Sequence, residues 1–178
     1  MRGRSIVTGI GVAAISMMAH VPRADAQTAN RAIALDSLTL SSPSALPIAI
    51  LRLVAQDYAS QGTPVSCPNL RRCDDLRLYG VSVDLDGDGS KEWIVTDMGF
   101  TGTGAELDYI FRKSAERRWK RIGRIEGLHL RTVGPKKTRG FLDINGYVAG
   151  ACVEGRGEAV WNGYQYVKRE GRLKPRPC

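Results

Sequence analysis

Histidine is scarce in this chain, which leaves few residues for general acid–base chemistry. There are two histidines, and His20 lies in an N-terminal segment that we expect to be cleaved, so His129 remains. The sequence contains no G-x-S-x-G motif, and no cysteine has the setting of an activated thiol. Asp97, Asp108 and His129 are the candidates for a hydrolase, and no motif supports them. The chain is therefore expected not to be an enzyme.

Long apolar runs are also scarce, and the one near the N-terminus is too short to span a bilayer. Arg2 and Arg4 precede the mostly apolar stretch 6–19, and an A-x-A site, Ala24-Asp25-Ala26, follows. A spanning helix needs roughly 20 apolar residues. We therefore expect a signal peptide at 1–26, a periplasmic or secreted protein, and no transmembrane anchor once that peptide is removed.

The remaining length fits one domain. Of 178 residues, 152 follow the signal peptide, which is enough for one core and too few for two. The stretch 27–43 is small and polar, and predicts a flexible leader or one peripheral strand near 32–40, ahead of a single domain at 44–178. The signal holds three of the 26 basic and one of the 18 acidic residues, so the rest has a net charge of +6.

All four cysteines lie after the signal peptide. They are Cys67, Cys73, Cys152 and Cys178. No C-x-x-C pair and no neighbouring histidine favours zinc. An even number of cysteines in an exported protein predicts two disulfides, for which three pairings exist. We favour Cys67–Cys73, a tight loop, and Cys152–Cys178, which would tie the chain end to a strand.

One helix is predicted. Ser44 is a suitable N-cap, Pro47 fits the first turn, and apolar residues recur at helical spacing from Ile50 to Tyr58. Gly62 is expected to end the helix. Its apolar face is expected to cover one face of a sheet.

From Leu76 onward the patterns predict strands. Expected strands are 76–85, 93–98, 107–112, 118–125, 128–133 and 141–144, followed by a hairpin with a type I′ turn at Asn162-Gly163. Pro135 and a basic turn separate 128–133 from 141–144, and 143–146 is interpreted as a turn. The predicted fold class is mainly β (α+β): an antiparallel meander, as a curved sheet or small barrel, with the N-terminal helix packed on it.

The stretch from Asp84 to Glu92 carries the clearest chemistry. Aspartates alternate, Gly89 follows the third, and a glutamate closes the run before an apolar strand. Calcium takes six to eight oxygen ligands, which a short curled loop can supply. The expected Ca2+ ligands are Asp84, Asp86, Asp88, the Ser90 carbonyl and Glu92. The other interpretation is an acidic, glycine-rich turn that binds no metal.

The spacing does not fit an EF-hand, because position twelve of the loop is Val95 instead of an acid. The run instead resembles the loop of FG-GAP/VCBS-type repeats, found in integrin α-subunit propeller blades. Asp84, Asp86, Asp88, Gly89 and Glu92 match its D-x-[DN]-x-D-G-x-x-[DE] pattern. The resemblance implies a calcium loop between two antiparallel strands. A whole propeller does not fit, because a blade uses about 40–45 residues and four or more blades are typical.

Basic residues crowd one predicted hairpin and form a candidate binding surface. Its members are Arg112, Lys113, Arg117, Arg118, Trp119, Lys120, Arg121 and Arg124. For an exported protein, the anionic partners within reach are cell-envelope polymers and acidic proteins, and no specific binding of nucleic acid is expected. The alternative is a solvated edge protected against aggregation by its charges.

Together these features favour an exported, non-catalytic calcium-binding β domain that binds an anionic polymer or a protein partner. The alternatives are an inhibitor or immunity protein against a cell-wall hydrolase, and a calcium-dependent hydrolase using Asp97, Asp108 or His129. The oligomeric state does not follow from the sequence.

Overall fold

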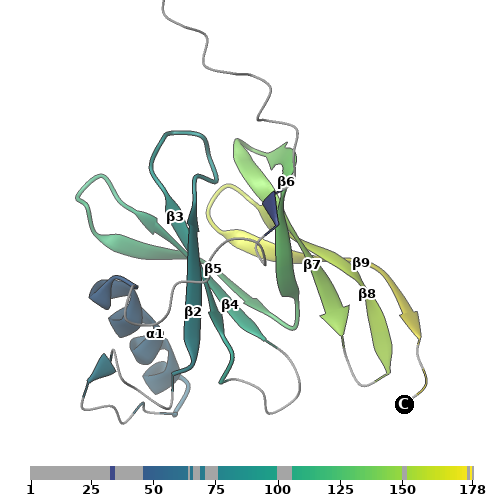
Figure 1. The fold of residues 1–178 in the computed structure, drawn as a ribbon, viewed down its shortest axis with the longest axis horizontal. Coiled ribbons are helices and arrows are strands. Elements are labelled where there is room, and N and C mark those ends of the chain that lie inside the picture. The colour runs from purple at the N-terminus through teal and green to yellow at the C-terminus, as the bar shows by residue number, and fades with distance from the viewer. Residues whose placement is uncertain are drawn as a thin grey trace, which may run out of the picture.

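The computed structural model describes residues 33–34, 46–63, 65, 69–70, 76–99, 106–149, 152–175 and 177. Within these residues nine strands form a single curled sheet, and one helix lies on one side of it (Figure 1). The elements are β1 (Ile33–Ala34), α1 (Ile48–Ser60), β2 (Leu78–Val83), β3 (Glu92–Asp97), β4 (Leu107–Lys113), β5 (Trp119–Glu126), β6 (His129–Thr138), β7 (Phe141–Ala149), β8 (Val153–Trp161) and β9 (Tyr166–Pro175). The predicted fold class is confirmed.

The sheet consists of two four-stranded antiparallel meanders, β2–β5 and β6–β9, with the short β1 paired to β6 at one edge. Their strand order is β1-β6-β7-β8-β9-β5-β4-β3-β2. The two meanders join where β5 runs parallel to β9, with Gly123 opposite Tyr166. Glycine suits this close approach, because a Cβ at position 123 would lie 3.0 Å from Tyr166 Cβ and 3.1 Å from Ile110 Cδ1.

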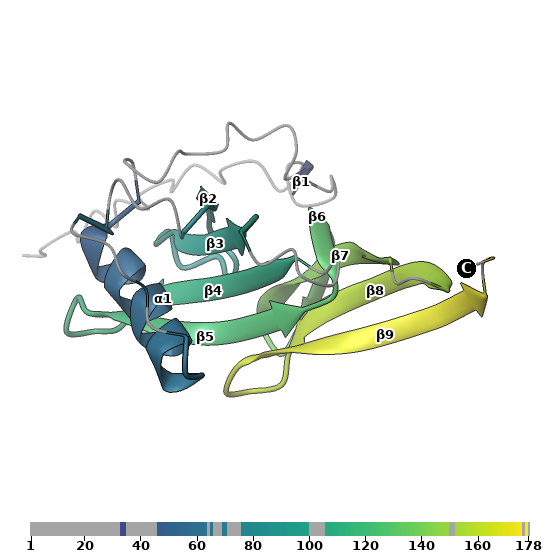
Figure 2. The ribbon, with the colours of Figure 1, turned by 90° about the horizontal axis from the view of Figure 1, so that it is seen from below.

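The two faces of the first meander are both buried. One face contributes Ile94 and Ile110 to a core shared with the second meander, which adds Ile144. The opposite face contributes Val95 and Tyr109 to a second cluster beneath α1. Figure 2 shows α1 lying against the β4–β5 side, away from β6–β9. Strands buried on both faces have continuous apolar runs in sequence, as in residues 109–111 of β4.

The helix begins later than predicted. Its N-cap is Pro47, no side chain caps it, and Ser44 lies outside the described residues. Proline suits this position because its fixed φ prepares the first turn. Three fully buried residues, Ile50, Leu51 and Val54, pack in the cluster between the helix and the sheet, and Gly62, at φ 79°, follows the helix.

Two turn predictions for this region were wrong. β6 continues through Pro135 to Thr138, because the pairing with β7 shifts between Val133 and Lys137 and leaves a bulge. The turn is instead Arg139-Gly140, where both φ angles are positive (51° and 91°), as in a type I′ hairpin. Residues 143–146 lie within β7.

The last hairpin has a wider loop than an Asn-Gly I′ turn. Trp161 pairs with Tyr166, which leaves the four residues 162–165 between them. The side-chain oxygen of Asn162 accepts from the backbone N–H of Tyr164 and of Gln165, each at 2.9 Å. Trp161 and Tyr166, which flank this loop, pack on Phe141, and the Trp161 and Phe141 rings are stacked with centroids 4.3 Å apart.

Candidate metal loop and the adjoining basic hairpin

The acid loop, residues 84–92, joins β2 to β3 and is held in shape by its own aspartates. Asp84 accepts from the N–H groups of Gly87 (2.6 Å) and Gly89 (3.0 Å). Asp86 accepts from Asp88 N, and Asp88 from Ser90 N. Gly87 and Gly89 have φ angles of 84° and 85°, a conformation in which a side chain is disfavoured. The sequence therefore curls the backbone so that the acids converge.

The structure brings the three predicted aspartates together. One carboxylate oxygen from each of Asp84, Asp86 and Asp88 lies within 4.8 Å of the others. Calcium–oxygen distances are roughly 2.3–2.6 Å, so oxygens this close can share one ion. Three carboxylates do not complete six to eight ligands, and the Ser90 carbonyl, Glu92 and water are the expected remainder.

Glu92 is fully buried beneath the loop, at 0% exposure. Its Oε2 accepts from Leu85 N at 2.8 Å, while Oε1 accepts no hydrogen bond. Burial raises the pKa of Glu92, the Leu85 N–H opposes that rise, and the charge of Asp86 adds to it. Glu92 is not one of the three clustered acids. Its carboxylate is linked to them through a cation.

That cation is Arg112 of β4. Its Nη2 pairs with Asp86 Oδ2 and lies 3.0 Å from Asp88 Oδ2, and its Nε lies 3.5 Å from Glu92 Oε1. Lys137 of β6 donates to the Asp86 carbonyl at 3.2 Å. Arg112 and Lys137 therefore balance part of the negative charge of these acids. Four carboxylates against these two cations still leave about two negative charges, so the loop favours further positive charge.

Comparisons with protein-family models, with curated proteins and with solved structures found no match. The likeness to FG-GAP/VCBS-type loops therefore rests on the residues of the loop alone. In the part of the chain that the structure describes, no helix is long and apolar enough to span a membrane.

The basic hairpin, β4–β5 with its turn, is largely paired with acids of the chain. Arg121 Nη1 pairs with Asp57 Oδ1 of α1, and Arg124 Nε lies 3.2 Å from Asp57 Oδ2. Tyr109 donates its hydroxyl to the same carboxylate at 3.1 Å. Burial raises the pKa of Asp57, but the hydrogen bond and charge of Arg121, with Tyr109 and Arg124, outweigh it, so that pKa lies below its ordinary value.

The remaining members of the predicted surface lie nearer the turn. Arg118 pairs with Glu116, both exposed, and such a pair contributes little to stability. Lys113 Nζ lies 5.1 Å above the Trp119 ring. Arg117 and Lys120 are exposed. The predicted surface therefore has two parts. Some of its arginines form ion pairs with α1 or the acid loop, and the other cations face solvent around the turn.

The acid loop and the hairpin turn meet at one hollow of about 670 Å3. It is lined by Asp88, Ser90, Arg112, Lys113, Ser114, Ala115 and Arg117. The two sets of residues predicted separately from sequence are thus neighbours. No sequence signal indicates this proximity, because it depends on the pairing of β3 with β4.

The predicted carboxylate pair does not form. Tyr58 donates to Asp97 at 2.6 Å beneath α1, whereas Thr96 donates to Asp108 at 2.5 Å on the other face of the sheet. Asp97 and Asp108 therefore point away from each other and cannot act on one bond. His129 Nδ1 lies 2.9 Å from Glu106 Oε2, and the two form a half-buried pair.

Cys152, at the start of β8, is disulfide-bonded. Cys67, Cys73 and Cys178 lie outside the described residues. The pairings Cys67–Cys73 and Cys152–Cys178 therefore stay a prediction.

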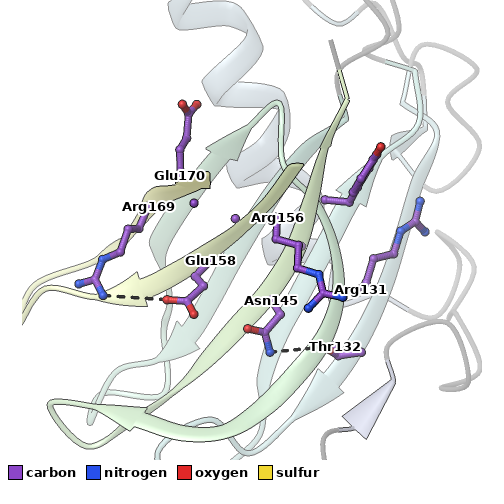
Figure 3. Close-up of a pocket in the computed structure, with 11 residues that line it drawn as sticks. Arg131, Thr132, Asn145, Arg156, Glu158, Arg169 and Glu170 are labelled. Carbon is purple, nitrogen blue, oxygen red and sulfur yellow. Dashed lines mark hydrogen bonds and ion pairs between the residues drawn. The ribbon is translucent and has the colours of Figure 1, made fainter. Parts of the chain in front are cut away.

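Sequence reasoning missed a second hollow, of about 730 Å3, on the outer face of β6–β9 (Figure 3). Figure 3 shows polar side chains from all four strands around it, among them Asn145, Arg156 and Glu158. Thr132, Asn145, Glu158 and Arg169 form one cross-strand row. A row of polar residues spread over four strands has no signature in the sequence.

Proposed function

We propose that the chain is an exported, non-catalytic β domain that binds calcium at the acid loop and an anionic polymer or protein partner at the basic hairpin. The observation that carries the proposal is the convergence of Asp84, Asp86 and Asp88 within 4.8 Å. The residual negative charge of the loop supports it as well, because Arg112 and Lys137 balance only part of the charge of its acids.

The contacts of Arg112 suggest how the two parts would work together. This residue belongs to the hairpin, yet its guanidinium contacts the acid loop. A metal that orders the loop would therefore also act on the hairpin turn. Calcium is favoured over magnesium because a loop of mixed carboxylate and carbonyl oxygens suits flexible geometry, whereas magnesium requires near-ideal octahedral geometry.

Calcium is expected to stabilise the fold. At a hundredfold excess over the dissociation constant, the free energy of unfolding should rise by about 2.7 kcal/mol. Thermal or urea unfolding in calcium and in EDTA measures this difference. Asp86→Ala should lose the response, whereas Glu116→Gln, an exposed acid of the hairpin turn, should keep it. An unchanged melting temperature for the wild-type protein in calcium would contradict the metal site.

Binding at the hairpin should weaken as salt rises, because contacts between charged groups are screened. Titration of the protein into an anionic polysaccharide at 50 and 300 mM salt is the measurement, with an uncharged polysaccharide as control. Affinity that does not depend on salt would exclude a charge-based surface.

The alternative proposal is an inhibitor or immunity protein against a cell-wall hydrolase. Its support is the small, disulfide-bonded β fold, and a pull-down against purified wall hydrolases tests it. A calcium-dependent hydrolase has weaker support, because Asp97 and Asp108 lie on opposite faces of the sheet.

A further inference from the structure

The hollow between the acid loop and the hairpin turn has walls of opposite charge. Asp88 lies on the loop side, and Lys113 and Arg117 lie on the turn side. Arg112 connects the walls, because its guanidinium reaches Asp88 from β4. Ala115 is the one apolar residue in the lining. Protein partners are usually held by buried aromatic and apolar anchors, so this hollow better suits a charged group of a polysaccharide.

Arg112 uses the carboxylates that a metal would use. It contacts Asp86 and Asp88, and its Nε lies 3.5 Å from the buried Glu92. Like charges a few ångströms apart repel each other strongly when they are partly shielded from water. A calcium ion on these carboxylates would therefore weaken the hold of the loop on Arg112.

The buried Glu92 also faces Arg112. The residue is 0% exposed, its Oε1 accepts no hydrogen bond, and Arg112 Nε lies 3.5 Å from that oxygen. This distance is long for a hydrogen bond, so the two groups form a loose ion pair. Arg112 is therefore held to the acid loop by ion pairs with three of its carboxylates.

We propose that calcium in the acid loop releases Arg112 into the hollow, where it joins Lys113 and Arg117 to bind an anionic group of a polysaccharide. This inference rests on the proposed calcium site and adds a ligand class and a switch to it. The Arg112 side chain is 35% exposed, so it can turn toward the hollow while β4 stays in place. Arg112 would also give up a modest contact with Phe141, whose ring centre lies 5.2 Å from its guanidinium carbon.

The turn fixes the place of Arg117. Its φ is 59°, and the turn is closed by its N–H, which donates to the Ser114 carbonyl at 2.9 Å. A type I turn followed by a residue in this left-handed conformation is a common hairpin loop. The turn presents the exposed Arg117 guanidinium beside the hollow.

Linkage makes the coupling reciprocal: if calcium tightens polymer binding by some factor, the polymer tightens calcium binding by the same factor. We expect a factor of about five or more. The test measures fluorescence anisotropy of labelled dextran sulfate with wild-type protein, in calcium and in EDTA at equal ionic strength. Uncharged dextran and magnesium are the ligand and metal controls.

Three variants separate the roles. Arg117→Gln should lose most of the binding in calcium. Arg112→Gln should bind dextran sulfate equally weakly in calcium and in EDTA, while its affinity for calcium itself should rise. Arg156→Gln is the matched control, because it removes an exposed arginine from the outer face of β8 and should keep the calcium response. Unfolding in EDTA checks that each variant is folded.

Several results would overturn the inference. If calcium raises the melting temperature but leaves the dextran sulfate affinity unchanged, the switch is wrong and the calcium loop stands. If calcium leaves the melting temperature unchanged, the calcium loop itself fails. A weaker calcium affinity in Arg112→Gln would mean that Arg112 supports the loaded loop. Equal losses of dextran sulfate affinity in Arg156→Gln and Arg117→Gln would mean that polymer binding does not use the hollow.

Discussion

Replacing Asp108 with asparagine is expected to make the protein more stable at pH 8 and to leave its stability at pH 4 nearly unchanged. Asp108 is 0% exposed, its Oδ1 accepts from Thr96, and its Oδ2 accepts no hydrogen bond. Burial raises the pKa of Asp108 to about 7, against the Thr96 hydrogen bond, and the charge of Glu106 adds to the rise.

The direction in which stability changes with pH follows from proton binding. A carboxyl group whose pKa is raised on folding binds its proton more tightly in the folded state. The stabilisation that protonated Asp108 gives the folded state is therefore complete below pH 4, and it is lost as the pH rises from about 4 to about 7. Each pKa unit corresponds to about 1.4 kcal/mol, so the loss reaches at most about 4 kcal/mol. Asparagine cannot ionise, and a variant carrying it avoids this loss.

Urea unfolding at pH 4, 6 and 8 measures the effect as the difference between variant and wild type. Glu116→Gln, which removes an exposed carboxylate, should show a difference that stays flat across this range. If Asp108→Asn is equally or less stable than wild type at pH 8, folding does not raise the pKa of Asp108, and its carboxylate is paired in the folded protein. The buried setting described for it would then be incorrect.

The local features of the fold could be predicted from sequence because they depend on neighbouring residues. Helical spacing from Ile50 to Tyr58 indicates α1, and alternation indicates most of the strands. The acid loop is also local: its aspartates bond to N–H groups two to five residues away. For these elements, the chemistry of a short stretch is sufficient.

The remaining features depend on strand register, which the sequence does not show. Arg112 meets Asp86 because β4 pairs with β3 next to the loop. Asp97 and Asp108 diverge because Thr96, not Asp97, is opposite Asp108. The bulge that admits Pro135 is another case, since it arises from a shift in the β6–β7 pairing. Residues such as Asp97 and Asp108, which the sequence groups as one candidate site, therefore lie apart in the fold. Residues distant in sequence, such as Arg112 and Asp86, lie in contact.

Asp57→Ala is expected to lower the free energy of unfolding and to strengthen binding to anionic polymers. Asp57 joins Arg121, Arg124 and Tyr109, and so fastens α1 to the hairpin. Removing one member of a buried ion pair costs roughly 3–5 kcal/mol. The Asp57 side chain is 9% exposed, but its arginines are 41% and 28% exposed, so we expect about 3 kcal/mol, the lower end of that range.

The same change leaves two guanidinium groups without their carboxylate, which increases the positive charge available on the hairpin. Dextran sulfate should therefore bind the variant more tightly than wild type, in calcium and in EDTA alike, because Asp57 is remote from the acid loop. Glu126→Gln is the matched control: it removes an exposed partner of Arg124 and should change stability by less than about 1 kcal/mol. If Asp57→Ala is destabilised but binds no more tightly, Arg121 and Arg124 serve only to hold the helix. The binding surface then reduces to the cations around the turn.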